Sequence, residues 1–98
     1  MARLIWSPRA RQDLIDICDF IARDSRQRAA ELSDRLVELI EHLPEQPYAG
    51  SIVPEYERSD LRERFLFKYR VLYLIRENDV DVVRILHGAR DLSQEMIE

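Results

Sequence analysis

Three arginines and a histidine in the second half of the chain are the residues best suited to chemistry. Arg62, Arg70, His87 and Arg90 lie at the starts or ends of extended segments. If these segments form an antiparallel meander, we expect the four side chains to converge at one edge of the sheet. Such a set could hold an RNA phosphate and stabilise the charge of an attacking 2′-hydroxyl, with the histidine moving the proton. A structural alternative stays open, because arginines along a sheet also pair with carboxylates such as Glu63.

The elements that must hold these residues are predicted by hydrophobic patterning and helix caps. Residues 3–6 are a strand candidate, and Ser7-Pro8 supplies an N-cap and a first helical proline for a helix that ends near Arg23. Asp24, followed three residues later by a glutamine, resembles a capping box and predicts a second helix that Pro44 ends. Two amphipathic helices with a very short connection form a helical hairpin.

The second half of the sequence predicts a sheet for the hairpin to cover. Runs rich in Val, Ile, Leu, Phe and Tyr occupy residues 61–67, 70–76 and 80–87, and short links make them an antiparallel meander. The fold class is therefore α+β in the order β-α-α-β-β-β. An N-terminal strand and a two-helix hairpin pack on a small antiparallel sheet, in one domain over residues 1–98. We expect the other sheet face to be partly exposed and to carry the charges.

Composition excludes several classes of protein. The net charge of −4 argues against nucleic-acid binding by bulk electrostatics, although residues 61–90, with seven basic and four acidic groups, reach +3. The single cysteine, Cys18, excludes an intramolecular disulfide and a multi-cysteine zinc site, and we expect no metal and no cofactor. No apolar run approaches the roughly 18–20 residues that cross a bilayer, and the N-terminus lacks a signal-peptide pattern. We therefore expect a cytoplasmic protein with no membrane partner.

Several linked motifs follow one another along the chain: Trp6-Ser7-Pro8-Arg9-Ala10 leading into Asp13-Leu14 and Ile17, Phe20-Ile21-Ala22, Leu43 with Pro47 and Gly50, Leu61-Arg62-Glu63, Tyr69-Arg70-Val71-Leu72-Tyr73 and His87-Gly88-Ala89-Arg90-Asp91. Together, in this order and at these separations, they resemble the RelE/ParE superfamily of bacterial toxins from type II toxin–antitoxin (plasmid stabilisation) systems. The resemblance covers about residues 3–92. The fold that it implies agrees with the strand, two helices and meander predicted from the residues.

The resemblance implies one of two activities. In the RelE-like branch the toxin is a ribosome-dependent endoribonuclease that cuts mRNA, and Arg62, Arg70, His87 and Arg90 are its candidate catalytic residues here. In the ParE-like branch the toxin inhibits DNA gyrase and is not known as an enzyme. We favour the ParE-like branch, because a net charge of −4 suits the anionic ribosome poorly and no tyrosine or lysine follows Asp91. A third interpretation is a decayed toxin that only binds its antitoxin.

The resemblance also implies a cognate antitoxin as the principal partner. Its C-terminal segment would fold on binding the toxin, and operator DNA would be reached only through the antitoxin. The toxin must then supply an apolar groove with charges at its rim. We assign to this groove the surplus apolar positions of the second helix and two arginines: Leu32, Leu36, Leu39, Ile40, Leu43, Arg64 and Arg84. A broad core stripe is the structural alternative for the five apolar residues.

Overall fold

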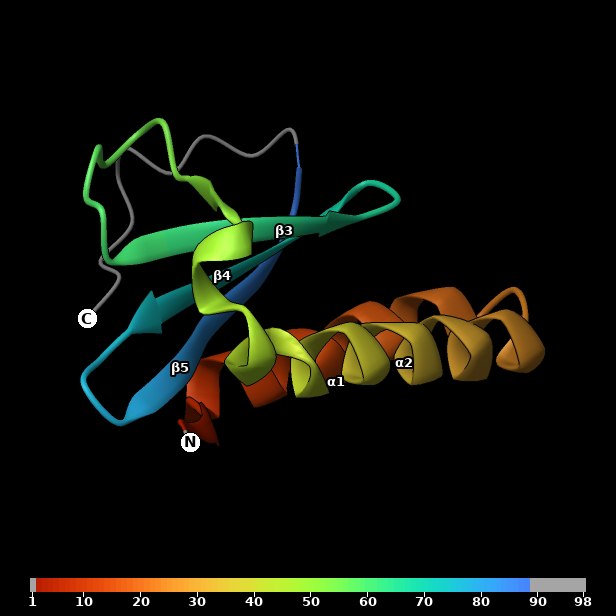
Figure 1. Cartoon of the computed structure of the whole chain (residues 1–98). Helices are drawn as coiled ribbons and strands as arrows, with labels where there is room; N and C mark the ends of the chain where they lie inside the picture. The colour runs from red at the N-terminus through yellow and green to blue at the C-terminus, as the bar shows by residue number, and fades with distance from the viewer. Residues whose placement is uncertain (1, 89–98) are drawn as a thin grey trace.

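The computed structural model describes residues 2–88 of the chain. Figure 1 shows the two long helices side by side, covering one face of a twisted sheet. The elements, in chain order, are β1 (Arg3–Trp6), α1 (Pro8–Ala22), α2 (Arg26–Glu41), η1 (Leu43–Glu45), η2 (Pro47–Ala49), β2 (Ser51–Ile52), β3 (Leu61–Leu66), β4 (Tyr69–Ile75) and β5 (Asp79–His87). The predicted order of a strand, two helices and a meander is confirmed.

Both helices begin at a serine. The Ser7 hydroxyl accepts a hydrogen bond from the Ala10 N–H at 3.0 Å, and Pro8 follows as the first helical residue. The Ser25 hydroxyl accepts from the Arg28 N–H at 3.1 Å. The second helix is therefore capped one residue later than the capping box starting at Asp24 predicts, because Asp24 still belongs to the turn that closes α1.

The five strands form one sheet in the order β1-β5-β4-β3-β2. Strands β3, β4 and β5 form the predicted antiparallel meander, and the short β2 pairs antiparallel with β3. Strand β1 pairs parallel with β5, from Arg3 opposite Asp79 to Trp6 opposite Val82. The sheet is thus mixed: the predicted antiparallel meander is confirmed, and the N-terminal strand, whose pairing the sequence did not specify, adds a parallel edge to it. Parallel neighbouring strands need a long connection, and the helical hairpin with strands β2 to β4 supplies it between β1 and β5.

The sheet separates two hydrophobic clusters. The larger cluster lies between the helices and the sheet and includes Leu36, Ile40 and Tyr73. The second cluster lies on the opposite face, and its buried members among residues 2–88 are Val53, Leu61, Leu72, Leu74, Val83 and Leu86. Tyr56, from the segment between β2 and β3, packs against this cluster. The expectation of a partly exposed, charged second face holds in part: the β2–β3 segment covers much of this face and buries Arg70 and Glu63 there, whereas Phe65 stays 53% exposed on it.

Among residues 2–88, no helix combines the length and apolar character that a bilayer span needs. Within the same residues, the His, Cys, Asp and Glu side chains form no cluster of three or more that could hold a metal ion.

Candidate partner-binding site

The structure does not bring Arg70 and His87 together. Arg70 lies opposite Leu86 in the β4–β5 ladder, and His87 lies opposite Tyr69. Because successive side chains of a strand point to opposite faces, Arg70 and His87 lie on different faces of the sheet. The predicted convergence of these two residues was therefore wrong, because the register of the β4–β5 ladder directs their side chains to opposite faces.

Arg62 also lies apart from both residues. It pairs with Tyr73 in the β3–β4 ladder, toward the end of β4 that is remote from Arg70. Its guanidinium donates to the carbonyl oxygens of Ser59 at 2.9 Å and Gly50 at 3.0 Å. Arg90, the fourth member of the predicted set, lies outside the described residues.

Arg70 is enclosed by two carboxylates. Its Nε lies 2.7 Å from Glu63 Oε1, and its Nη1 lies 2.9 Å from Glu55 Oε2. The side chains of Arg70 and Glu63 are only 5% and 6% exposed. The hydrogen bond to Glu55, followed by the one to Glu63, raises the pKa of Arg70 against the opposing effect of burial. Two carboxylates thus neutralise this guanidinium, and it does not face solvent as a phosphate-binding group would.

Arg84 also pairs with a carboxylate inside the fold. The β4–β5 register shifts between Leu72 and Tyr73, and Arg84 lies at this irregularity. Its Nε lies 2.8 Å from Asp13 Oδ2 of α1, and the same carboxylate oxygen accepts the Ile85 N–H at 2.9 Å. This buried pair joins the first helix to the last strand. Arg64, the other arginine assigned to the groove, stays half-exposed on β3.

His87 is exposed at the end of β5 and contacts Tyr69. The two rings meet edge to face, with centroids 6.2 Å apart and an interplanar angle of 75°. Burial raises the pKa of the Tyr69 hydroxyl above its ordinary value. Of the predicted catalytic set, the structure therefore leaves His87 and Arg62 accessible, at separate places, and encloses Arg70.

The apolar positions assigned to the antitoxin groove lie mainly in the core. Leu36, Ile40 and Leu43 are almost completely buried, and Leu32 is buried with a small exposed fraction. Leu39 is partly buried and packs against the same cluster. For these five residues the structure therefore supports the alternative of a broad core stripe. Of the five, only Leu32 also lines the groove described next.

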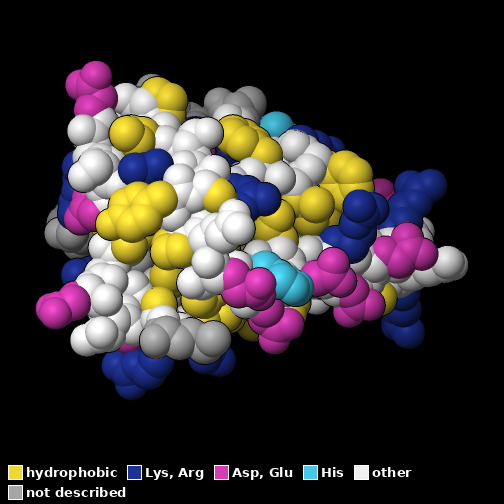
Figure 2. Space-filling view, viewed as in Figure 1, with side chains coloured by type: hydrophobic (Ala, Val, Ile, Leu, Met, Phe, Trp, Pro, Cys, Tyr) yellow, Lys and Arg dark blue, Asp and Glu magenta, His cyan; other side chains and the backbone are white. Residues whose placement is uncertain are grey.

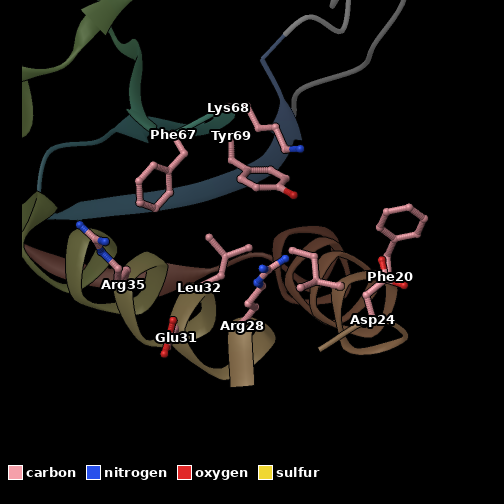
Figure 3. A pocket seen from close by; sticks show the side chains of 10 residues that line it. Phe20, Asp24, Arg28, Glu31, Leu32, Arg35, Phe67, Lys68 and Tyr69 are labelled. Carbon is pink, nitrogen blue, oxygen red and sulfur yellow. The ribbon is translucent and has the colours of Figure 1, made fainter. Parts of the chain in front are cut away.

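A groove of about 540 Å³ opens where three elements meet (Figure 3). The end of α1 with the turn after it, the part of α2 from Arg28 to Arg35, and the β3–β4 turn with the start of β4 line it with ten residues: Phe20, Ile21, Asp24, Arg28, Glu31, Leu32, Arg35, Phe67, Lys68 and Tyr69. Phe20 and Phe67 are 66% and 67% exposed, more than any other large hydrophobic side chain of the described residues. Phe67 has a positive φ of 53°, which directs the chain through the tight β3–β4 turn.

The charges around the groove are mixed, with basic groups in excess. Arg28, Arg35 and Lys68 outnumber Asp24 and Glu31 among its lining residues. The Arg35 guanidinium also lies 4.8 Å from the centroid of the Phe67 ring. An apolar surface with exposed aromatic rings and basic neighbours suits an amphipathic polypeptide segment with acidic residues. The sequence prediction missed both phenylalanines.

A signal for Phe20 and Phe67 is nevertheless present in the sequence. Phe20 falls outside the apolar stripe of the first helix, so a core position does not account for it. Phe67 stands at the end of a strand beside Lys68, where a turn is expected. Large apolar residues at such positions indicate a binding surface when they gather in space, and their clustering is visible only in the fold.

Comparisons with known proteins agree with this fold and with the motif resemblance. A family model described as "ParE toxin of type II toxin-antitoxin system, parDE" matches residues 4–92. A relative named Toxin RelE2, from Caulobacter vibrioides, is 33% identical over 91 residues, which cover 92% of this chain and 99% of the relative. A solved structure, the chromosomal ParDE TA system from P. aeruginosa, matches with a TM-score of 0.75 at 21% identity, over 89% of this chain and 96% of that chain. The structural likeness bears on the fold alone.

Proposed function

The chain belongs to the ParE toxin family of type II toxin–antitoxin systems, and on this premise we propose that it arrests growth by binding DNA gyrase. The single observation that supports binding over cleavage is the enclosure of Arg70 by Glu55 and Glu63. A ribonuclease needs accessible cations around the scissile phosphate, and this one is neutralised inside the fold. The net charge of −4 supports a protein target over the anionic ribosome.

A cognate antitoxin neutralises the toxin in this proposal by occupying the groove between α1, α2 and the β3–β4 turn. The exposed rings of Phe20 and Phe67 supply apolar anchors, and the three basic residues of the groove receive acidic side chains. A segment that is disordered alone and folds on binding suits such a partly polar surface. Operator DNA is then contacted by the antitoxin and not by this chain.

The groove can be tested with two phenylalanine variants. Phe67→Ser removes an exposed ring from the groove, whereas Phe65→Ser removes a ring that is 53% exposed on the other face of β3. We expect Phe67→Ser to weaken the complex with the cognate antitoxin at least tenfold, and Phe65→Ser to change it less than twofold. Equal losses in the two variants, measured by calorimetry, would argue against the groove.

The second candidate function is mRNA cleavage on the ribosome. Two observations favour it: the relative is named Toxin RelE2, and His87 is exposed beside Tyr69. In that case His87 would act in proton transfer and Arg62 would contact the phosphate chain, while Arg70 would have to leave its two carboxylates.

Two assays on the same purified chain separate these functions. In a supercoiling assay with purified gyrase, we expect inhibition that rises with toxin concentration and that His87→Ala retains. In a translating extract, we expect full-length mRNA to persist. Ribosome-dependent mRNA cleavage that His87→Ala abolishes, with supercoiling unaffected, would replace the first function by the second.

A further inference from the structure

Helix α1 carries a large apolar side chain on the side turned away from the groove. Ile15 lies at the middle of this 15-residue helix and is 51% exposed. Phe20, which lines the groove, stands five residues later and therefore projects about 140° away around the helix axis. Neither the core cluster on the helix side of the sheet nor the groove includes Ile15.

The apolar surface continues from Ile15 toward β1. A hollow of about 400 Å³ lies beside this residue, and Trp6, Arg11, Leu14 and Ile15 line it. Trp6 and Leu14 pack against the core cluster on the helix side of the sheet and keep part of their surface exposed. An exposed isoleucine alone needs no explanation, whereas three apolar side chains that share one hollow form a surface that a partner can cover.

The charges on either side of Ile15 form a self-complementary pattern. Arg11 stands four residues before it and Asp19 four residues after it, and both are exposed. Residues four apart lie on one face of a helix, so basic, apolar and acidic side chains follow one another along this face. Within residues 2–88 neither charge forms an ion pair. Arg11 shares that property with other arginines, and it is distinguished by its position relative to Ile15 and Asp19.

We propose that this face of α1 packs antiparallel against the same face of a second copy of the chain. A two-fold axis beside Ile15 relates each position before it to the equivalent position after it. Arg11 of each copy then lies opposite Asp19 of the other copy, and the two isoleucines meet between the two ion pairs. The dimer goes beyond the proposed function and requires neither gyrase nor the antitoxin, because the groove lies on another side of α1.

A second copy fits this face better than a partner of one charge sign does. A polyanion or an acidic segment would attract Arg11 and repel Asp19, whereas a second copy offers a partner to both. Helix α2 is a less suitable surface, because it holds none of the exposed large hydrophobic side chains of the described residues. Figure 2 shows acidic side chains along it instead. A 15-residue helix is about 22 Å long, so the contact area is small for a protein interface and the dimer should be weak.

Sedimentation equilibrium of the purified full chain tests the dimer. Between roughly 5 and 500 µM we expect the average mass to rise from the 11.7 kDa of one chain toward twice that value, with a dissociation constant on the order of 50 µM. Arg11→Asp and Asp19→Arg should each weaken the dimer about tenfold or more, because each places like charges opposite one another twice. The control Arg9→Asp makes the same charge change at an exposed position of α1, about 120° around the helix from Ile15. It should alter the dissociation constant by about twofold at most.

An equal mixture of the two weakened variants gives the most specific result. Arg11→Asp presents only acidic side chains at the two positions and Asp19→Arg only basic ones, so the two should associate with each other more tightly than either does with itself. Circular dichroism shows whether each variant is folded; Ile15→Ser replaces one that is not and should also weaken the dimer about tenfold.

Three outcomes would overturn the proposal. They are the mass of one chain at every concentration of the unaltered protein, equal effects of Arg9→Asp and Arg11→Asp, and no association in the mixture of the two variants. The measurement needs neither gyrase nor the antitoxin, so its failure is separate from a failure of the proposed toxin activity.

Discussion

Replacing Arg70 by methionine tests whether this residue is structural or catalytic. The guanidinium and the Glu63 carboxylate that it contacts are 5% and 6% exposed, and Glu55 contributes a third charge that is 20% exposed. Arg70→Met leaves Glu63 charged and buried without its cation. Breaking such a pair from one side costs about 3–5 kcal/mol. A single domain has about 5–15 kcal/mol of stability in total, so we expect a large loss in the free energy of unfolding.

Two companion variants make the measurement specific. Arg76→Met breaks the pair with Asp81, in which the arginine is 51% exposed, and we expect a loss of under about 1 kcal/mol. The double variant Arg70→Met/Glu63→Leu removes both buried charges and should recover most of the loss, because an apolar replacement of a buried pair is often neutral. Urea denaturation at pH 7, followed by circular dichroism, measures all three.

The result that would refute this reasoning is a stable Arg70→Met variant. A loss of less than about 1 kcal/mol would mean that the buried network contributes little to the fold. If the stable variant also lost mRNA cleavage on ribosomes, Arg70 would be catalytic, and the proposal that the toxin acts by binding would lose its main support.

Three further predictions concern single side chains. Asp13→Ala leaves Arg84 buried without its carboxylate and should cost about 3 kcal/mol in urea denaturation; an unchanged midpoint would contradict it. Gly50→Ala places a Cβ against the Tyr73 hydroxyl and 2.9 Å from the Glu63 carbonyl oxygen, so we expect a loss of about 1–3 kcal/mol and a lower Tm. Burial raises the pKa of Tyr73, so the unfolded state releases this proton first and the free energy of unfolding falls as the pH rises above about 10. Tyr73→Phe loses the 2.7 Å bond to the Pro47 carbonyl, about 1 kcal/mol at pH 7, and should show a shallower decline between pH 9 and 11.

Local features of the fold could be predicted from the sequence, and long-range ones could not. The serine–proline cap of α1 and the strands of the meander follow from short patterns, and their observed bounds differ by about one residue from those predicted. The parallel pairing of Arg3 with Asp79 joins positions 76 residues apart, and no local pattern specifies it. The covering of the second sheet face could not be predicted either. The segment that carries Val53 and Tyr56 packs on this face, and its path depends on the completed sheet.

The candidate site illustrates the same limit in chemical terms. The sequence identifies Arg70 and Arg84 as arginines on strands, and it offers many carboxylates as partners. The partners that the structure selects are Glu55, 15 residues away, and Asp13, 71 residues away. Whether an arginine is buried with a carboxylate or exposed to a partner thus depends on contacts that form only in the folded chain.

We propose above all that this toxin inhibits DNA gyrase and leaves mRNA intact. The most direct measurement is a pulse of labelled thymidine and of labelled methionine during the first minutes after the chain is induced without its antitoxin. We predict that thymidine incorporation falls first while methionine incorporation continues. If methionine incorporation collapses first and thymidine incorporation persists, the target is translation, and the account given for Arg70 and the groove no longer supports the assignment to gyrase.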